Sequence, residues 1–280
     1  MITLGRIGRY GFLLLVAAVS LFPLMWMVLS AFKPGGDVIA RPFAFDFDQL
    51  SWTNFREMVH TIPIGTGLRN TMIVVLVKGA LTLLCCPMAG YAFAKFDFAF
   101  KRALFGTVLT TLMLPTLVLL IPLLLEMSEL GWVNTFPALI LPGAVDAFGV
   151  FWMRQIIAEI PDELLDAARV DGAGELRIFR SVVLPVIRPG LAALGVLTFI
   201  NVYNDFVWPV VAVNDTGHQT LQVMLSGLAR AAVVGQLGDA ASAWGQLLAA
   251  STVAAVPVLI VFVLLQRHLI RGVMAGSVKG

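Results

Sequence analysis

Long uninterrupted apolar stretches constrain this chain more than any other feature of its sequence. Each stretch has the length of roughly 20 residues that a bilayer-spanning helix needs. Each is apolar all round, whereas a surface helix of a soluble protein carries a polar face. The six stretches run approximately over residues 10–32, 70–94, 103–125, 136–157, 190–213 and 244–267. The sequence therefore predicts an all-α integral membrane protein with six transmembrane helices in a single domain, residues 1–280.

The composition agrees with a membrane protein and argues against a soluble one. Hydrophobic residues make up 59% of the chain and charged residues 13%, outside the usual range of soluble domains. The first apolar stretch follows Arg6 and Arg9, as a signal peptide would, but it exceeds the roughly 7–15 apolar residues of a signal sequence. We expect it to be retained as a span. The three histidines are scattered and the two cysteines are adjacent inside a span, so no metal site is expected.

Lysine and arginine in the loops predict the orientation, because cytoplasmic loops carry the excess of positive charge. With the N-terminus inside, thirteen Lys and Arg fall on the cytoplasmic side and five on the outer side. Lys78 is left within the second span. We therefore expect both termini to be cytoplasmic. The net charge of +2 reflects this uneven distribution and gives no sign of nucleic-acid binding.

One cytoplasmic loop, residues 158–189, concentrates charge in an otherwise apolar chain. Ten of the 36 charged residues fall within 159–188. Pro161 suits the first turn of a helix, and Gly172 and Gly174 would end it. A second short helix can start near Glu175, and we expect Pro185 to end it. A short exposed helix with an apolar stripe fits the groove of a partner protein, and the alternative is a helix lying on the membrane surface.

The loop resembles a signature of permease subunits in ATP-binding-cassette importers. That signature reads E-A-A, three residues, G, nine residues, I, one residue, L-P. The chain has Asp166-Ala167-Ala168, then Gly172, Val182 and Leu184-Pro185 at the same spacings. The resemblance implies that this loop is a coupling helix, between helices 4 and 5, that docks on a cytoplasmic ATPase subunit. The residues it implicates are Glu163, Asp166, Ala167, Ala168, Asp171, Gly172, Leu184 and Pro185.

Other segments are similar to the carbohydrate-uptake branch of these importers. They include a second span ending in "GYAFAKFDF", the segment "NVYNDFVWPV" and a closing "GSVKG" that is similar to the tail of the second, maltose-type permease subunit. The resemblance implies the fold of this permease family (MetI-like) and an inner-membrane location. It also implies four kinds of partner: a second permease, two ATPase subunits, an extracytoplasmic solute-binding protein and a sugar.

The chain lacks the residues that would let it hydrolyse ATP. A phosphate-binding loop ends in Gly-Lys followed by Ser or Thr, and no Gly-Lys pair occurs in the sequence. The sequence also has no H-E-x-x-H and no G-x-S-x-G motif, which weighs against a membrane enzyme. We therefore expect no cofactor on this chain, with ATP and Mg²⁺ bound by the partner ATPase.

Polar residues at membrane depth are the candidates for the solute pathway. Asn201, Asn204, Asp205 and Trp208 have the spacing of one helix face. Because a charge in the membrane is costly, this face should meet protein or water. The hypothesis is that it lines the pathway, and the alternative is bonding to neighbouring helices. Lys78 and Asp146, also at membrane depth, either neutralise each other or pair elsewhere.

Two other readings of function stay open at this level. An ion-coupled secondary transporter would use the intramembrane charges for coupling. An importer of the same family could take glycerol phosphate or an amino sugar instead of a di- or oligosaccharide. The sequence leaves all of these solutes open.

Overall fold

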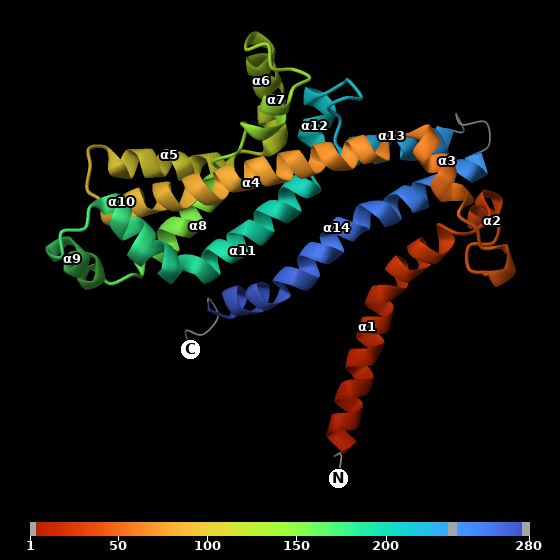
Figure 1. Ribbon diagram of the computed structural model, residues 1–280, viewed down its shortest axis with the longest axis horizontal. Helices are drawn as coiled ribbons and strands as arrows, with labels where there is room; N and C mark the ends of the chain where they lie inside the picture. The colour runs from red at the N-terminus through yellow and green to blue at the C-terminus, as the bar shows by residue number, and fades with distance from the viewer. Residues whose placement is uncertain (1–3, 235–239, 276–280) are drawn as a thin grey trace. The chain divides into compact units, whose positions relative to one another are not determined.

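The computed structural model describes residues 4–234 and 240–275, and helices are the only regular elements in these ranges. Figure 1 shows them in order along the chain. The helices of the first half are α1 (Leu4–Ser30), α2 (Gly35–Ala40), η1 (Phe47–Gln49), α3 (Thr53–Thr61), α4 (Ile64–Lys95), α5 (Lys101–Met113), α6 (Thr116–Glu129) and α7 (Phe136–Ile140). The second half holds α8 (Ala147–Ala158), α9 (Asp162–Val170), α10 (Glu175–Ile178), η2 (Phe179–Val183), α11 (Leu184–Tyr203), α12 (Val207–Ala212), α13 (Leu221–Val234) and α14 (Ala240–Ala275).

Four helical stretches are long and apolar enough to cross a membrane. They are Gly8–Ser30, Ile64–Lys95, Glu175–Tyr203 and Ser242–Gln266. A fifth candidate is the pair α5 and α6, which bends by 108° between its halves. The predicted all-α membrane fold is therefore present in the described residues. Six unbroken spans are not, because three of the predicted stretches are divided between helices.

Proline explains the first two of these breaks. Between α5 and α6, Pro115 lacks the N–H that a continuing helix would use and forces the residue before it into extended backbone. Leu114 accordingly has φ −80° and ψ 124°. Between α7 and α8, Pro142 precedes Gly143, whose φ of +69° is a left-handed conformation that glycine adopts without steric cost. The 136–157 stretch therefore forms a short helix, a turn and a second helix.

The third break corrects the expectation of one helix over 190–213. Helix α11 ends at Tyr203, and Asn204 has φ −90° and ψ 0°. A new helix, α12, starts at Val207. The carboxylate of Asp205 accepts hydrogen bonds from the backbone N–H groups of Val207 and Trp208, as the cap of a helix start does. An internal acid thus caps the start of the second helix.

The expectation that Pro185 ends the helix after the charged loop is wrong. The helical stretch runs without interruption from Glu175 to Tyr203. It contains a turn of π-helix over Phe179–Val183, where the N–H of Leu184 bonds to the carbonyl of Phe179. Pro185 then occupies the first turn of α11. Because Pro is tolerated in a first turn and the π-helix changes the bonding pattern before it, the helix passes the proline.

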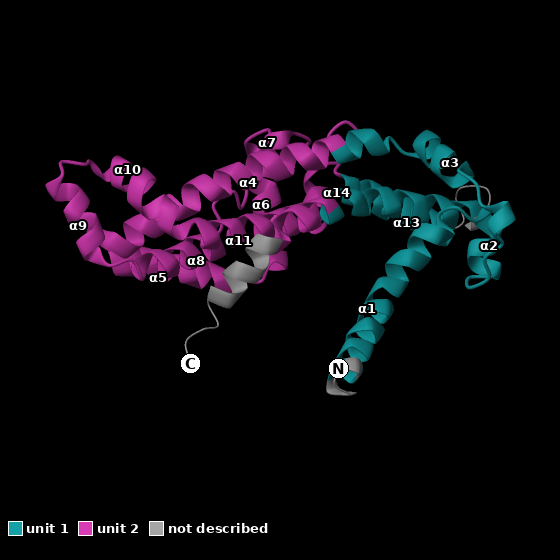
Figure 2. Ribbon diagram, turned by 60° about the horizontal axis from the view of Figure 1, so that its bottom comes forward, with its two compact units in different colours: residues 1–68, 221–259 teal, residues 69–220, 260–280 magenta. Residues whose placement is uncertain are grey.

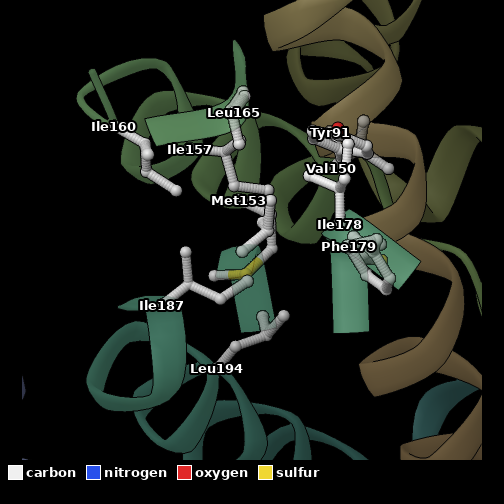
Figure 3. Close-up of a cluster of buried hydrophobic side chains, with 12 residues drawn as sticks. Tyr91, Val150, Met153, Ile157, Ile160, Leu165, Ile178, Phe179, Ile187 and Leu194 are labelled. Carbon is white, nitrogen blue, oxygen red and sulfur yellow. The ribbon is translucent and has the colours of Figure 1, made fainter. Parts of the chain in front are cut away.

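The chain divides into two compact units, coloured separately in Figure 2. Unit 1 holds residues 1–68 and 221–259, and unit 2 holds residues 69–220 and 260–280. Unit 2 contains a core cluster, shown in Figure 3, where side chains of α4, α8, α9, α10 and α11 meet. Its fully buried members include Met153, Ile157, Ile178, Val183 and Ile187. This core supports the charged loop, because Leu165 of α9 belongs to it.

Candidate functional site

The charged loop folds as a helix, a glycine turn and a second helix, as the sequence predicts. Asp162 and Glu163 lie in the first turn of α9 and Arg169 in its last turn, an order that suits the helix dipole. The turn is a Schellman motif: the N–H of Gly172 bonds to the carbonyl of Arg169, and that of Ala173 to the carbonyl of Ala168. Gly172 has φ +79°, which explains why this position requires glycine.

Helix α9 buries some of its apolar side chains and exposes others. Leu165 is 1% exposed and packs in the core of unit 2. In contrast, Leu164 is 49% exposed and Val170 is 87% exposed. Ala167 lies between them on the helix and is also exposed. Three apolar residues at intervals of three thus form an outward stripe on a helix outside the membrane spans, which we name the α9 face.

The residues that the loop signature implicates fall into two groups. Glu163, Asp166 and Asp171 are exposed on or beside α9, close to the α9 face. Ala168 is half-buried and packs against the core, so its small size allows α9 to seat closely. The second group, Leu184 and Pro185, lies in the first turn of α11, the helix that follows the loop.

A chain of polar contacts joins α9 to α10 and to the end of α4. The guanidinium of Arg169 donates to Asp166 at 2.7 Å and to Glu175 at 2.9 Å. The hydroxyl of Tyr91 donates to the other oxygen of Glu175 at 2.7 Å. These hydrogen bonds to the two carboxylates raise the pKa of Arg169 above its usual value. The carboxylate of Asp166 is thus bonded within its own loop and remains 65% exposed. We call these four residues the loop network.

A second polar contact holds the start of α9. The ammonium of Lys95 donates to the carbonyl of Ile160 at 2.5 Å and to the carboxylate of Asp162 at 2.7 Å. The hydrogen bond from Lys95 lowers the pKa of the Asp162 carboxyl. Sequence reasoning missed Tyr91, Lys95 and Glu175 as loop contacts. The available signal was weak: Tyr91 and Lys95 end an apolar span at the side of the membrane where the loop emerges.

The two acidic residues at membrane depth both cap helices. Asp146 accepts a hydrogen bond from the N–H of Gly149 at the start of α8. Asp205 does the same for α12. Lys78 interacts electrostatically with both carboxylates, but among the described residues it forms no ion pair with Asp146 within 4.0 Å. The role that Asp146 and Asp205 share is to cap helices that start inside the predicted spans, where an uncapped N–H would be costly.

The candidate pathway residues do not share one helix face, because the chain breaks at Asn204. Asn201 and Asn204 are exposed in unit 2, and the amide of Asn204 donates to the carbonyl of Ile200. Trp208 is 8% exposed and its indole N–H donates to the carbonyl of Ala138 at 2.8 Å. Trp208 therefore ties α12 to α7. Of the four candidate pathway residues, Asn201 and Asn204 are the ones whose side chains are exposed in this chain.

Broken helices inside the predicted spans, with internal caps at the breaks, are typical of membrane transport proteins. The chain belongs to the family described as binding-protein-dependent transport system inner membrane component, which it matches over residues 87–275. This confirms the resemblance drawn from the loop signature. The closing residues 276–280, which also carried that resemblance, lie outside the described residues.

Curated relatives are similar over almost their whole length. An arabinooligosaccharide transport system permease of Halalkalibacterium halodurans is 35% identical, with 95% of this chain and 93% of the relative covered. A lactose transport system permease of Rhizobium radiobacter is 33% identical, with 99% and 97% covered. A crystal structure of a bacterial ABC transporter involved in the import of alginate contains a chain of the same fold. It has a TM-score of 0.79 at 23% identity and covers 93% of this chain and 95% of that chain.

Proposed function

We propose that this chain is one of two permease subunits of an ATP-driven importer for a di- or oligosaccharide. The α9 face carries the proposal: an apolar stripe flanked by acids, outside the membrane spans, suits docking in a groove of a soluble partner. The partner that fits the loop signature is an ATPase subunit, which would bind ATP and Mg²⁺. The family supports an extracytoplasmic binding protein as a further partner.

The other elements of the proposal follow from the charge distribution and from the relatives. Both termini would face the cytoplasm, because the positive-inside excess places the charged loop there. A second, related permease would complete the pathway, and two ATPase subunits would bind below. Relatives named for arabinooligosaccharides and for lactose support a sugar as the solute.

Copurification tests the partner. The tagged chain, expressed with its natural partners and extracted in mild detergent, should bring a second permease and an ATPase with it. Val170→Asp places a charge on the α9 face without touching the loop network, so it should release the ATPase and keep the second permease. Ser181→Asp, at an exposed position of the same loop but outside α9, should keep both. Asp166→Lys should also release the ATPase.

Two results would contradict the proposal. If the unaltered chain purifies alone or as a self-oligomer, an ion-coupled transporter becomes the better reading, and uptake should then collapse with the ion gradient. If Val170→Asp retains the ATPase, α9 is not the docking surface. Uptake of labelled disaccharides, oligosaccharides, amino sugars and glycerol phosphate then decides among the solutes that this family of importers handles.

A further inference from the structure

The segment after α2 turns back along the end of α1. The indole N–H of Trp26 on α1 donates to the carbonyl of Pro42 at 2.8 Å. The ring of Phe43 lies beside that of Phe22, with centroids 6.5 Å apart and planes 26° apart. Phe22 is eight residues before the end of α1 at Ser30. The 41–47 segment therefore lies alongside the last two turns of α1. All of these residues belong to unit 1.

The position of Phe22 gives the depth of this segment in the membrane. Arg6 and Arg9 hold the start of α1 at one membrane face, and the apolar stretch ends at Ser30. With a rise of about 1.5 Å per residue, Phe22 lies roughly 12 Å before the end of the helix. A hydrocarbon core of approximately 30 Å that begins just beyond Arg9 includes Phe22. The ring of Phe43, which lies beside that of Phe22, therefore lies within the outer half of this core.

Irregular backbone at this depth needs partners for its carbonyl groups, and Lys33 supplies them. Its ammonium donates to the carbonyl of Arg41 at 2.8 Å and to that of Pro42 at 3.1 Å. The same ammonium lies 4.2 Å from the ring centroid of Phe45. Lys33 is 3% exposed, so its charge is enclosed by these groups. Non-helical backbone at membrane depth is tolerated where it is buried in protein, and Lys33 and Trp26 cover the carbonyls of Arg41 and Pro42 on the protein side.

The phenylalanines beside this enclosed lysine point outward. Phe43 and Phe47 are each 71% exposed, and Phe45 between them is half-buried over Lys33. Their surface continues the apolar surface of α1, whose most apolar stretch has no residue buried within this chain. Asp46 caps η1: its exposed carboxylate accepts a hydrogen bond from the backbone N–H of Asp48. Phenylalanine rings carry no polar group, so removing them from water into acyl chains is favourable.

We propose that residues 41–47 form a lipid anchor that inserts Phe43 and Phe47 among the acyl chains at the end of α1. Lys33 and Trp26 hold the inserted turn by binding its carbonyl groups. The anchor fixes the depth of α1 and the start of the loop that leads to α3. It does not depend on which solute is carried.

Photo-crosslinking to lipid tests the anchor in the intact transporter. The complex is reconstituted in phosphatidylethanolamine and phosphatidylglycerol vesicles containing a phospholipid with a diazirine on its acyl chain. After illumination, adducts are located by peptide mass spectrometry. Residues 41–47 should carry adducts at a yield comparable with that of exposed α1 residues such as Leu14 and Val19. Helix α9, also exposed and apolar but outside the spans, is the control within the same molecule and should carry none.

Lys33→Met provides the second arm. Without the ammonium the carbonyls of Arg41 and Pro42 lose partners and seek water, so adducts at 41–47 should fall several-fold while those on α1 stay unchanged. Adducts on α1 but not on 41–47 would overturn the anchor, because the segment would then be in water or covered by a second protein. Unchanged adducts in Lys33→Met would overturn the holding role of the lysine.

Discussion

Tyr91→Phe removes one hydroxyl group and with it the bond between the end of α4 and the charged loop. The Tyr91 ring is 5% exposed and packs against Phe96 and Phe179, contacts that phenylalanine keeps. The lost bond is the one from the hydroxyl to the carboxylate of Glu175. Because Glu175 also holds Arg169, the change weakens the anchoring of α9 to the membrane part of the protein.

The free energy lost on removing this hydrogen bond depends on the charge and the exposure of its acceptor, Glu175. A hydrogen bond to a charged group contributes about 1.5–3 kcal/mol. The side chain of Glu175 is 41% exposed, so water competes for it. We therefore expect a loss of about 1–2 kcal/mol in the free energy of opening the loop, which increases the opened fraction roughly 5–30-fold.

Limited trypsin digestion of the chain in lipid nanodiscs measures that fraction, because cleavage at a folded loop follows its local opening. The loop offers exposed cleavage sites at Arg177 and Arg180. Cleavage there should accelerate in Tyr91→Phe by the factor given above. Tyr10→Phe is the matched control, since it removes the hydroxyl of a half-exposed ring on α1 in unit 1. Cleavage of Tyr91→Phe at the rate of the unaltered chain would refute the reasoning.

Three further predictions concern the membrane helices. Gly90→Ala would place a methyl group 2.8 Å from the backbone of α8, so the thermal midpoint in detergent should fall with a loss of about 1–3 kcal/mol; an unchanged midpoint would contradict this contact. Asn204→Ala and Asp205→Asn should each raise the apparent KM of uptake if they line the pathway, and unchanged affinity and rate would remove them from it. Exchanging charges, Lys78→Asp with Asp146→Lys, should not restore expression, because lysine cannot accept the hydrogen bond that caps α8; restored expression would instead show direct pairing.

Local properties of the sequence were sufficient for the class of protein and for the charged loop. The length of an apolar run decides whether a helix can cross a bilayer, and this property belongs to each segment alone. The form of α9 is likewise local: acids in the first turn, Arg169 in the last, and a glycine with positive φ at Gly172. For these reasons the loop signature could be read from its spacing, before any contact was known.

The tertiary structure decided where the spans break and what holds the loop. Residues 190–213 have the composition of one helix, and the break at Asn204 depends on Asp205 capping α12 and on Trp208 bonding to a carbonyl 70 residues away. The contact of Tyr91 with Glu175 joins positions 84 residues apart. Contacts of this kind form only when separate helices pack, so helical spacing cannot reveal them. Apolar length determines that this chain enters the membrane, and packing between distant segments determines how its helices are interrupted and how its loop is held.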